Sequence, residues 1–424
     1  MAGVQQQQQQ AQTETARRLG PRPLPLHLSA AAMTWMSSLA ALPHLKSGSL
    51  SWKSPLQKSA NDLVADLQAA DSEALTAAVE QEVRRRLAAF ADGLEAYRHH
   101  PYRRELAEPR EAWREGTTRL LDYGGDSAVD AGDYPLLVVP SLINRAYILD
   151  LNEESSLLRW LAGHGLRPYL VDWDRPGPEE RRFTLTDYIV GRLERALELV
   201  RRETGRPPIL VGYCMGGLLA LGLAERRGGD LAGLALLATP WDFQTENGAP
   251  PHVIAAGLAA AAPALELLGE MPVDLIQALF AALDPEVAVK KFLAFARMDP
   301  AGARARRFVA LEDWLNDGVP LAAPVARECL GGWYGENTPA RKAWRVAGRP
   351  VDPARVTLPT LCLLPDQDRI VPPTSARALA EAIPGAESLA PQIGHIGMIV
   401  SGRAREKVWQ PLLTWLMACA AKVG

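Results

Sequence analysis

The chain lacks the features that mark membrane-spanning, nucleic-acid-binding or repeat proteins. No run of roughly eighteen apolar residues occurs in its 424 residues, so no transmembrane segment is expected. The formal net charge of −3 is close to balance and gives no indication of a nucleic-acid partner. There are no internal repeats. A hydrophobic content of 48% nevertheless allows a substantial core, so we expect a globular protein.

Cysteine is scarce. The four cysteines are scattered without Cys-x-x-Cys spacing, at Cys214, Cys329, Cys362 and Cys419. This pattern argues against a zinc site or a disulfide framework and is compatible with a reducing compartment. We therefore expect no metal site.

The beginning of the chain is compositionally distinct. Residues 1–28 hold a glutamine tract and a proline-rich stretch, which predict a disordered or extended tail. Prolines break the apolar stretch that follows Arg17 and Arg18, so we do not expect a secretory signal. We expect a cytoplasmic location instead. Residues 29–48 are expected to form a short amphipathic helix that either packs on the main domain or seeks a hydrophobic body. Together, residues 29–122 are expected to form a helical extension.

From about residue 123 the pattern is that of an α/β domain. Short, continuous apolar runs alternate with helix-length segments, which predicts a doubly wound, mostly parallel sheet covered on both faces. The runs are 134–140, 168–173, 208–213, 234–239 and 360–365. We expect this catalytic domain to extend over 123–424, with residues 248–347 inserted as a lid over the active site.

The segment LVGYCMGGLLAL contains the motif Gly-x-Cys-x-Gly between an apolar run and an Ala/Leu-rich helix. This arrangement is typical of the nucleophile elbow of the α/β-hydrolase fold, with Cys214 at its tip. Gly212 and Gly216 would let the strand and the helix approach closely. The alternative is a buried, inert cysteine, which is how we interpret Cys362 and Cys419.

In this fold the acid and then the histidine follow the nucleophile along the chain. His395 lies between glycines in GHIG and is the expected base, with His252 a weaker candidate. Two aspartates lie on the loop after the run at 360–365. We favour Asp368 as the acid, and Asp366 is then a capping or surface residue.

An oxyanion hole requires two backbone N–H groups. The residue after the nucleophile, Met215, is expected to supply one. The loop after the first core strand supplies the other, from Leu142 or Ile143. The helix that begins at Met215 would also favour the thiolate of Cys214.

Six motifs in a fixed order resemble the catalytic subunit of the polyhydroxyalkanoate synthases, and most closely their short, two-subunit class. The resemblance covers about residues 115–418. The motifs are PSLINRAYILDL (140–151), LVDWDRPG (170–177), GYCMGG (212–217), ATPWDF (238–243), DRIVPP (368–373) and GHIGMIVSG (394–402).

The resemblance implies an acyltransferase that polymerises 3-hydroxyacyl-CoA, with Cys214, Asp368 and His395 as its catalytic residues. It also implies a second, non-catalytic synthase subunit, assembly as a homodimer or hetero-oligomer, and a place at the surface of polyester granules. CoA enters as part of the substrate, so no cofactor is expected.

Cysteine suits this chemistry, because exchange of one thioester for another keeps the acyl group activated for transfer. Two alternatives stay open. One is a cysteine-dependent hydrolase of the same fold, either an acyl-CoA thioesterase or an intracellular polyhydroxyalkanoate depolymerase. The other is a non-catalytic granule-associated relative, against which the intact Cys-Asp-His set argues.

Overall fold

The computed structural model describes residues 18–124, 133–245 and 251–422. The chain divides into two compact units. One takes the residues up to Tyr102 together with Asp284–Asn316, and the other takes Arg103–Leu283 together with Asp317–Gly424.

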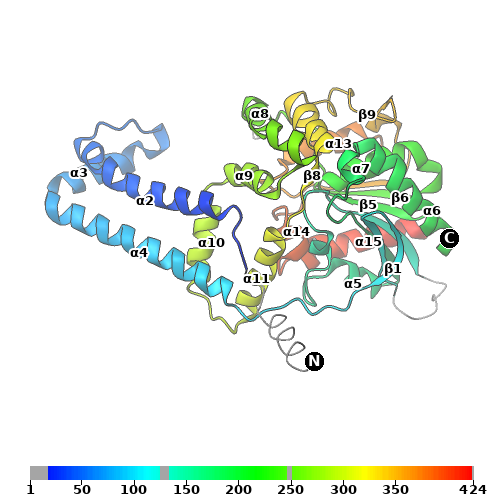
Figure 1. Ribbon diagram of the computed structural model, residues 1–424, viewed down its shortest axis with the longest axis horizontal. Helices are drawn as coiled ribbons and strands as arrows, with labels where there is room; N and C mark the ends of the chain where they lie inside the picture. Colours follow the sequence, from blue (N-terminus) through cyan, green and yellow to red (C-terminus); the bar gives the residue numbers. More distant parts are fainter. Residues whose placement is uncertain (1–17, 125–132, 246–250, 423–424) are drawn as a thin grey trace. The chain divides into compact units, whose positions relative to one another are not determined.

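The larger unit is built on one eight-stranded sheet with the strand order β1-β2-β4-β3-β5-β6-β11-β12 (Figure 1). All neighbours from β4 to β12 are parallel, whereas β2 is antiparallel to both β1 and β4. The central strands β3 to β6 are buried along their whole length, as expected for a sheet covered on both faces. The predicted α/β fold and its five core runs are confirmed. The strands are β1 (Arg110–Glu115), β2 (Thr118–Asp122), β3 (Tyr134–Val139), β4 (Leu166–Asp172), β5 (Ile209–Tyr213), β6 (Gly233–Leu237), β11 (Thr360–Leu363) and β12 (Glu387–Leu389).

Helices cover both faces of this sheet. Figure 1 shows α6 and α7 on one side of it and α5 and α15 on the other. The short helix α14 follows the loop that carries His395. The helices are α5 (Leu157–Ala162), α6 (Glu194–Thr204), α7 (Met215–Arg227), α13 (Pro373–Ala382), α14 (Gly397–Val400) and α15 (Gln410–Ala420).

The prediction of a helical extension as far as residue 122 is wrong over its last part, because β1 and β2 form a hairpin at the edge of the sheet. The many charged residues of β1 resemble those of a solvated helix. In the fold, however, the Arg110 guanidinium pairs across the hairpin with the Asp122 carboxylate at 2.7 Å, and Leu120 is fully buried. Gly116 makes the turn with a φ of 58°, which glycine adopts without strain.

The N-terminal part of the smaller unit also differs from expectation. Helix α2 (Leu24–Ser47) begins inside the segment predicted to be disordered or extended, since a proline in its first turn does not break a helix. The predicted helix over 29–48 is present as part of α2, where Trp35 is buried but Met33 and Met36 are exposed. The part of the predicted tail up to residue 17 lies outside the described residues.

From residue 18 onward, all regular elements of the smaller unit are helices. Helix α4 packs on α2 and on α10 around an aromatic core that includes Phe90, Tyr97 and Phe292. A Cβ on Gly93 would lie 2.2 Å from the main-chain oxygen of Phe292, so glycine is required for α4 and α10 to approach this closely. The further helices are α3 (Gln57–Ala69), α4 (Ser72–Arg98), α10 (Val287–Phe295) and α11 (Ala303–Asn316).

The insertion predicted as one lid over 248–347 is divided between the two compact units. Its middle part, Asp284–Asn316, belongs to the compact unit of the N-terminal helices. Phe292 of α10 packs against Phe90 of α4, and Phe308 of α11 packs against Phe292. Its two outer parts stay in the unit of the sheet, where β7 and β8 pair antiparallel. These parts contain α8 (Pro251–Leu268), β7 (Glu270–Met271), α9 (Val273–Leu283), β8 (Leu321–Ala322), α12 (Ala323–Arg327) and a wide helical turn, η6 (Glu328–Gly335). Within the described ranges, no helix combines the length and the apolar character needed to cross a membrane.

Candidate active site

Cys214 occupies a sharp turn between β5 and α7. Its backbone has φ 56° and ψ −128°, a conformation that costs energy for any residue other than glycine. The Cys214 N–H donates to the main-chain oxygen of Leu237 at 2.8 Å, which anchors the turn to the neighbouring strand β6. The strained geometry predicted for a nucleophile elbow is thus present, with the cysteine at the N-terminus of α7.

The glycines of the motif allow this turn to close. A Cβ on Gly216 would lie 2.2 Å from the main-chain oxygen of Val139, and one on Gly217 would lie 1.8 Å from the Thr239 hydroxyl oxygen. A Cβ on Gly212 would lie 2.5 Å from the Cα of Gly217. Real atoms do not approach so closely, so α7 reaches β3 and β6 only because these positions lack side chains.

His395 lies on the loop between β12 and α14 and faces Asp368 on the loop after β11. The Nδ1 atom of His395 is 2.6 Å from the Asp368 Oδ2 atom, and both side chains are buried. Asp368 Oδ1 accepts hydrogen bonds from the N–H groups of Ile370 and Val371, each at 2.8 Å. The carboxylate is therefore held with one oxygen toward the imidazole.

Cys214 and His395 interact directly. Burial alone would lower the pKa of the His395 imidazole, but the charge of Cys214, the hydrogen bonds to Asp368 and Cys214 and the charge of Asp368 raise it to about 10. An imidazole with such neighbours holds a proton when the cysteine is a thiolate. The structure thus brings together the three residues predicted as a catalytic set.

Of the two aspartates on the loop after β11, only Asp368 contacts the histidine. Asp366 is exposed, and its N–H donates to the main-chain oxygen of Pro391 at 3.1 Å. This geometry favours the assignment of the acid to Asp368. The side chain of His252, the weaker histidine candidate, lies outside the described residues.

The predicted oxyanion donors belong to two segments, the start of α7 and the loop after β3. Met215 is the first residue of α7, where an N–H has no partner within the helix. The loop after β3 contacts this helix start, since a Cβ on Gly216 would be only 2.5 Å from the Pro140 oxygen. The Ile143 N–H donates to the Ser141 hydroxyl at 3.1 Å, which leaves Leu142 as the better candidate on this loop.

Two tyrosines near the cysteine were not singled out from the sequence. The Tyr213 hydroxyl donates to the main-chain oxygen of His395 at 3.2 Å. Tyr334, in η6, has its pKa raised by burial and by the charge of Cys214. It also packs edge-on against Phe243, which follows β6, with ring centroids 4.7 Å apart. Only tertiary contacts identify them, because neither lies in a motif for tyrosine chemistry.

The other cysteines differ from Cys214, whose side chain is half-buried. Cys329, Cys362 and Cys419 are buried, and burial raises the pKa of each thiol. A raised pKa keeps a thiol protonated and unreactive. This supports the interpretation of Cys362 and Cys419 as inert.

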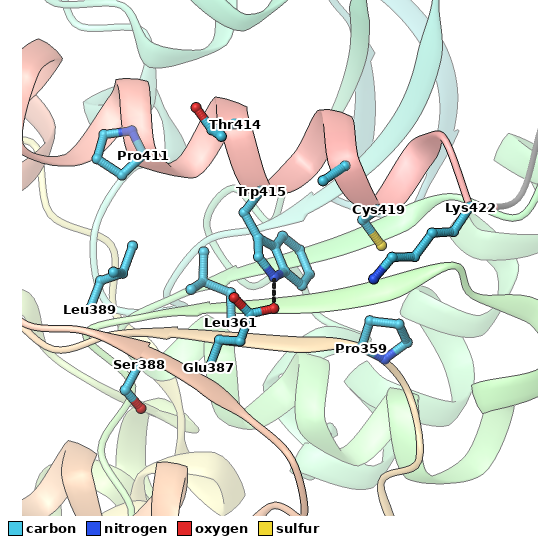
Figure 2. A pocket seen from close by; sticks show the side chains of 11 residues that line it. Pro359, Leu361, Glu387, Ser388, Leu389, Pro411, Thr414, Trp415, Cys419 and Lys422 are labelled. Carbon is cyan, nitrogen blue, oxygen red and sulfur yellow. Dashed lines mark hydrogen bonds between the residues drawn. The ribbon is translucent and has the colours of Figure 1, made fainter.

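A pocket of about 410 Å³ lies between α15 and the strands β11 and β12. Figure 2 shows the side chains that line it. Its lining is largely apolar and includes Leu361, Leu389 and Trp415. The Trp415 indole N–H donates to the Glu387 carboxylate at 3.0 Å. None of the three catalytic candidates lines this pocket.

Comparison with known proteins finds one fold family and several relatives that share one name. A sequence model described as the alpha/beta hydrolase fold matches residues 134–401. The chain is 30% identical over 297 residues to the poly(3-hydroxyalkanoate) polymerase subunit PhaC of Allochromatium vinosum, a match that covers 69% of this chain and 82% of that protein. The protein of the same name from Synechocystis sp. is 30% identical over 291 residues, covering 66% of this chain and 77% of the relative. For the one from Haloferax mediterranei the identity is 28% over 307 residues, and the match spans 72% of this chain but only 62% of the relative.

Proposed function

Because the chain belongs to the α/β-hydrolase fold family and, within it, to the poly(3-hydroxyalkanoate) polymerase subunits, we propose that it is an acyltransferase that polymerises 3-hydroxyacyl groups. The substrate is a 3-hydroxyacyl-CoA thioester, and the products are a polyester and free CoA. One observation carries the proposal above all. It is a cysteine at a strained elbow, in contact with a histidine that is itself paired with a buried aspartate.

The first half of the cycle loads the enzyme. The Cys214 thiolate attacks the carbonyl carbon of the substrate, and the N–H groups of Met215 and Leu142 stabilise the oxyanion. The bond between that carbon and the CoA sulfur then breaks. CoA leaves with the proton of the His395 imidazolium, and the acyl group remains on Cys214 as a thioester.

The second half transfers the acyl group. Neutral His395 accepts the proton of a 3-hydroxyl group on another acyl unit, and the hydroxyl oxygen attacks the thioester carbon. An ester bond forms while the bond to sulfur breaks, which lengthens the chain by one unit. The role of Asp368 is to hold the imidazole in orientation and to stabilise its charged form.

Water competes with the hydroxyl group in this second half, so the surroundings of Cys214 matter. Cys214 packs against the apolar core, the charge of Cys214 acts on the buried Tyr334, and the Tyr334 ring packs against Phe243. Such a lining disfavours water relative to an acyl chain, which supports transfer over hydrolysis. We propose that the parts of the insertion that contain η6 serve as the lid of the site.

The cysteine-dependent hydrolase remains the second candidate, because the same elbow and triad also support transfer to water. The products distinguish the two. We would incubate the purified chain with 3-hydroxybutyryl-CoA, alone and with a second synthase subunit, and follow CoA release and the fate of the acyl group. Insoluble polyester supports the synthase, whereas equimolar CoA and free 3-hydroxybutyrate in both conditions would support the hydrolase.

Cys214→Ala tests the nucleophile in the same assay and is expected to abolish CoA release. Cys362→Ala is the matched control, because Cys362 is a buried cysteine in β11 whose thiol pKa is raised by burial. Cys214→Ser is expected to retain little transfer, since an oxygen ester no longer keeps the acyl group activated.

Partner and location follow the same family. We propose a second, non-catalytic subunit, assembly as a homodimer or hetero-oligomer, and attachment to the surface of polyester granules in the cytoplasm. Size measurement of the purified chain with and without the second subunit tests the assembly.

A further inference from the structure

Tyr213 is the last residue of β5 and the direct neighbour of the nucleophile Cys214. Its side chain is 4% exposed. It contacts His395 in two ways: its hydroxyl donates to the His395 main-chain oxygen at 3.2 Å, and its ring lies along the imidazole with centroids 5.2 Å apart and planes inclined by 30°. One side chain therefore holds both the main chain and the ring of His395.

The turn that carries His395 is closed by main-chain hydrogen bonds on either side of the histidine, from the Met398 N–H to the Gly394 oxygen at 2.9 Å and from the Ile399 N–H to the Ile396 oxygen at 3.0 Å. Gly394 and Gly397 flank the histidine, and glycine has the greatest backbone freedom of any residue. Asp368 holds the Nδ1 atom of the ring, and the Gln367 N–H donates to the main-chain oxygen of Ile393 at 3.2 Å. None of these hydrogen bonds reaches the main-chain oxygen of His395. Among the described residues, the hydrogen bond to the main-chain oxygen of His395 comes from the Tyr213 hydroxyl.

We propose that Tyr213 is a positioning residue, whose hydroxyl fixes the His395 peptide so that the imidazole faces the Cys214 sulfur. Because Tyr213 and Cys214 are adjacent in the chain, the end of one strand then places both the nucleophile and its base. The inference rests on the proposed function in one respect, that Cys214 and His395 exchange a proton during catalysis.

The state of the phenol supports this role. Burial and the charges of Cys214 and Asp368 raise the pKa of Tyr213 well above its usual range, so its hydroxyl stays neutral and can donate. A buried donor that loses its proton would repel the carbonyl oxygen instead. The hydroxyl is therefore available as a donor at neutral pH.

The test uses Tyr213→Phe, which keeps the ring and removes only the hydroxyl. The first readout is the rate at which iodoacetamide alkylates Cys214 as a function of pH, with Cys214→Ala as the blank. Thiolate reacts and thiol does not, so this profile reports the proton balance between Cys214 and His395 without any substrate. The second readout is the kcat and KM of CoA release from 3-hydroxybutyryl-CoA.

For Tyr213→Phe we expect the acid limb of the alkylation profile to move to higher pH. We expect kcat to fall about tenfold while KM changes less than twofold, because substrate binding is untouched and one hydrogen bond that orders the base is lost. Tyr134→Phe is the matched control. Tyr134 is a buried residue of β3 whose hydroxyl donates to the main-chain oxygen of Pro207 at 3.0 Å, and removal of that hydroxyl should leave both readouts unchanged.

An alkylation profile for Tyr213→Phe that coincides with that of the unmodified chain would overturn the proposal. So would an equal change in Tyr134→Phe, or a failure of Tyr213→Phe alone to fold, since the hydroxyl would then serve the fold in general. If the unmodified chain releases no CoA either alone or with a second synthase subunit added, the proposed function is contradicted. In that case the alkylation profiles still test whether the Tyr213 hydroxyl positions His395, because they need no substrate.

Discussion

At the scale of single residues, the site depends on how neighbours orient and charge each group. Asp368 shows this clearly, because its two carboxylate oxygens have separate partners. The Oδ1 atom accepts hydrogen bonds from the N–H groups of Ile370 and Val371, and the Oδ2 atom faces His395. The carboxylate cannot rotate without losing two charge-assisted hydrogen bonds, so the imidazole has a fixed acceptor.

Replacing Asp368 by asparagine is expected to lower the rate of CoA release by on the order of 10³-fold or more. The amide can present an N–H to His395 Nδ1, which favours the tautomer unable to accept the proton of Cys214. Steady-state kinetics measures the effect. Asp366→Asn, on the same loop but exposed, should stay within twofold, and an equal loss in both variants would contradict the assignment.

The proton balance of His395 gives a second prediction. Because the charge and hydrogen bond of Cys214 help to raise its pKa to about 10, Cys214→Ala should lower that pKa, with Asp368 still holding it up. In the unmodified chain the His395 imidazole is protonated at pH 8, because this pH lies below its pKa of about 10. In Cys214→Ala the imidazole should lose its proton at a lower pH. Titration of the imidazole ring signals by NMR tests this. A midpoint that does not move, or that rises, would show that the two side chains are not coupled.

At the scale of elements, the close packing of α7 against the ends of β3 and β6 determines the elbow. Gly216→Ala would place a methyl group against main-chain oxygens of Val139 and Pro140, which cannot move away as a side chain would. We expect a loss of about 1–3 kcal/mol in the free energy of unfolding and a loss of CoA release, because α7 and the oxyanion donors shift apart. Denaturant unfolding measures the first and kinetics the second.

Gly228→Ala serves as the control for that variant, since a Cβ there meets nothing within 4 Å and its φ is −53°. Its stability should stay within about 0.5 kcal/mol of that of the unmodified chain. Should Gly216→Ala prove equally harmless, the close approach of α7 would not be a requirement of the elbow.

The loop after β6 is tied to the end of η6 by one buried side chain. Asn337 accepts a hydrogen bond from the Phe243 N–H at 3.0 Å and donates to the Asp242 carboxylate at 2.8 Å, and its φ is 54°. Asn337→Gly removes the side-chain hydrogen bonds without adding backbone strain, whereas Asn337→Ala removes the same hydrogen bonds and adds strain at this positive φ. We expect about 1–3 kcal/mol of destabilisation for Gly and about 1 kcal/mol more for Ala, measured by thermal unfolding. Equal stability of Asn337→Gly and the unmodified chain would show that the link does not hold the loop.

At the scale of the whole molecule, the chain forms two compact units, and the smaller one joins segments almost two hundred residues apart in sequence. Its core is aromatic, with Phe292 fully buried against Phe90 and Tyr97. Phe292→Ala should cost this unit about 3–5 kcal/mol. Hydrogen exchange should then accelerate in α4 and α10 and stay slow in β3 and β5.

Met33→Ala is the control for Phe292→Ala, because the Met33 side chain is 72% exposed and its removal should leave exchange unchanged. Uniform acceleration across both units in Phe292→Ala would mean that they unfold as one, contrary to the division seen in the contacts.

The amino-acid sequence by itself determined the core strands, the elbow and the order of Cys214, Asp368 and His395. These features follow from local information: continuous apolar runs, glycines at fixed spacing, and loops directly after strands. Only the tertiary structure decided the rest. The β1–β2 hairpin, the division of the insertion and the contact of Tyr213 with His395 depend on partners far away in the chain. No local pattern encodes such contacts, because the free energy that pays for them arises only when distant segments pack together.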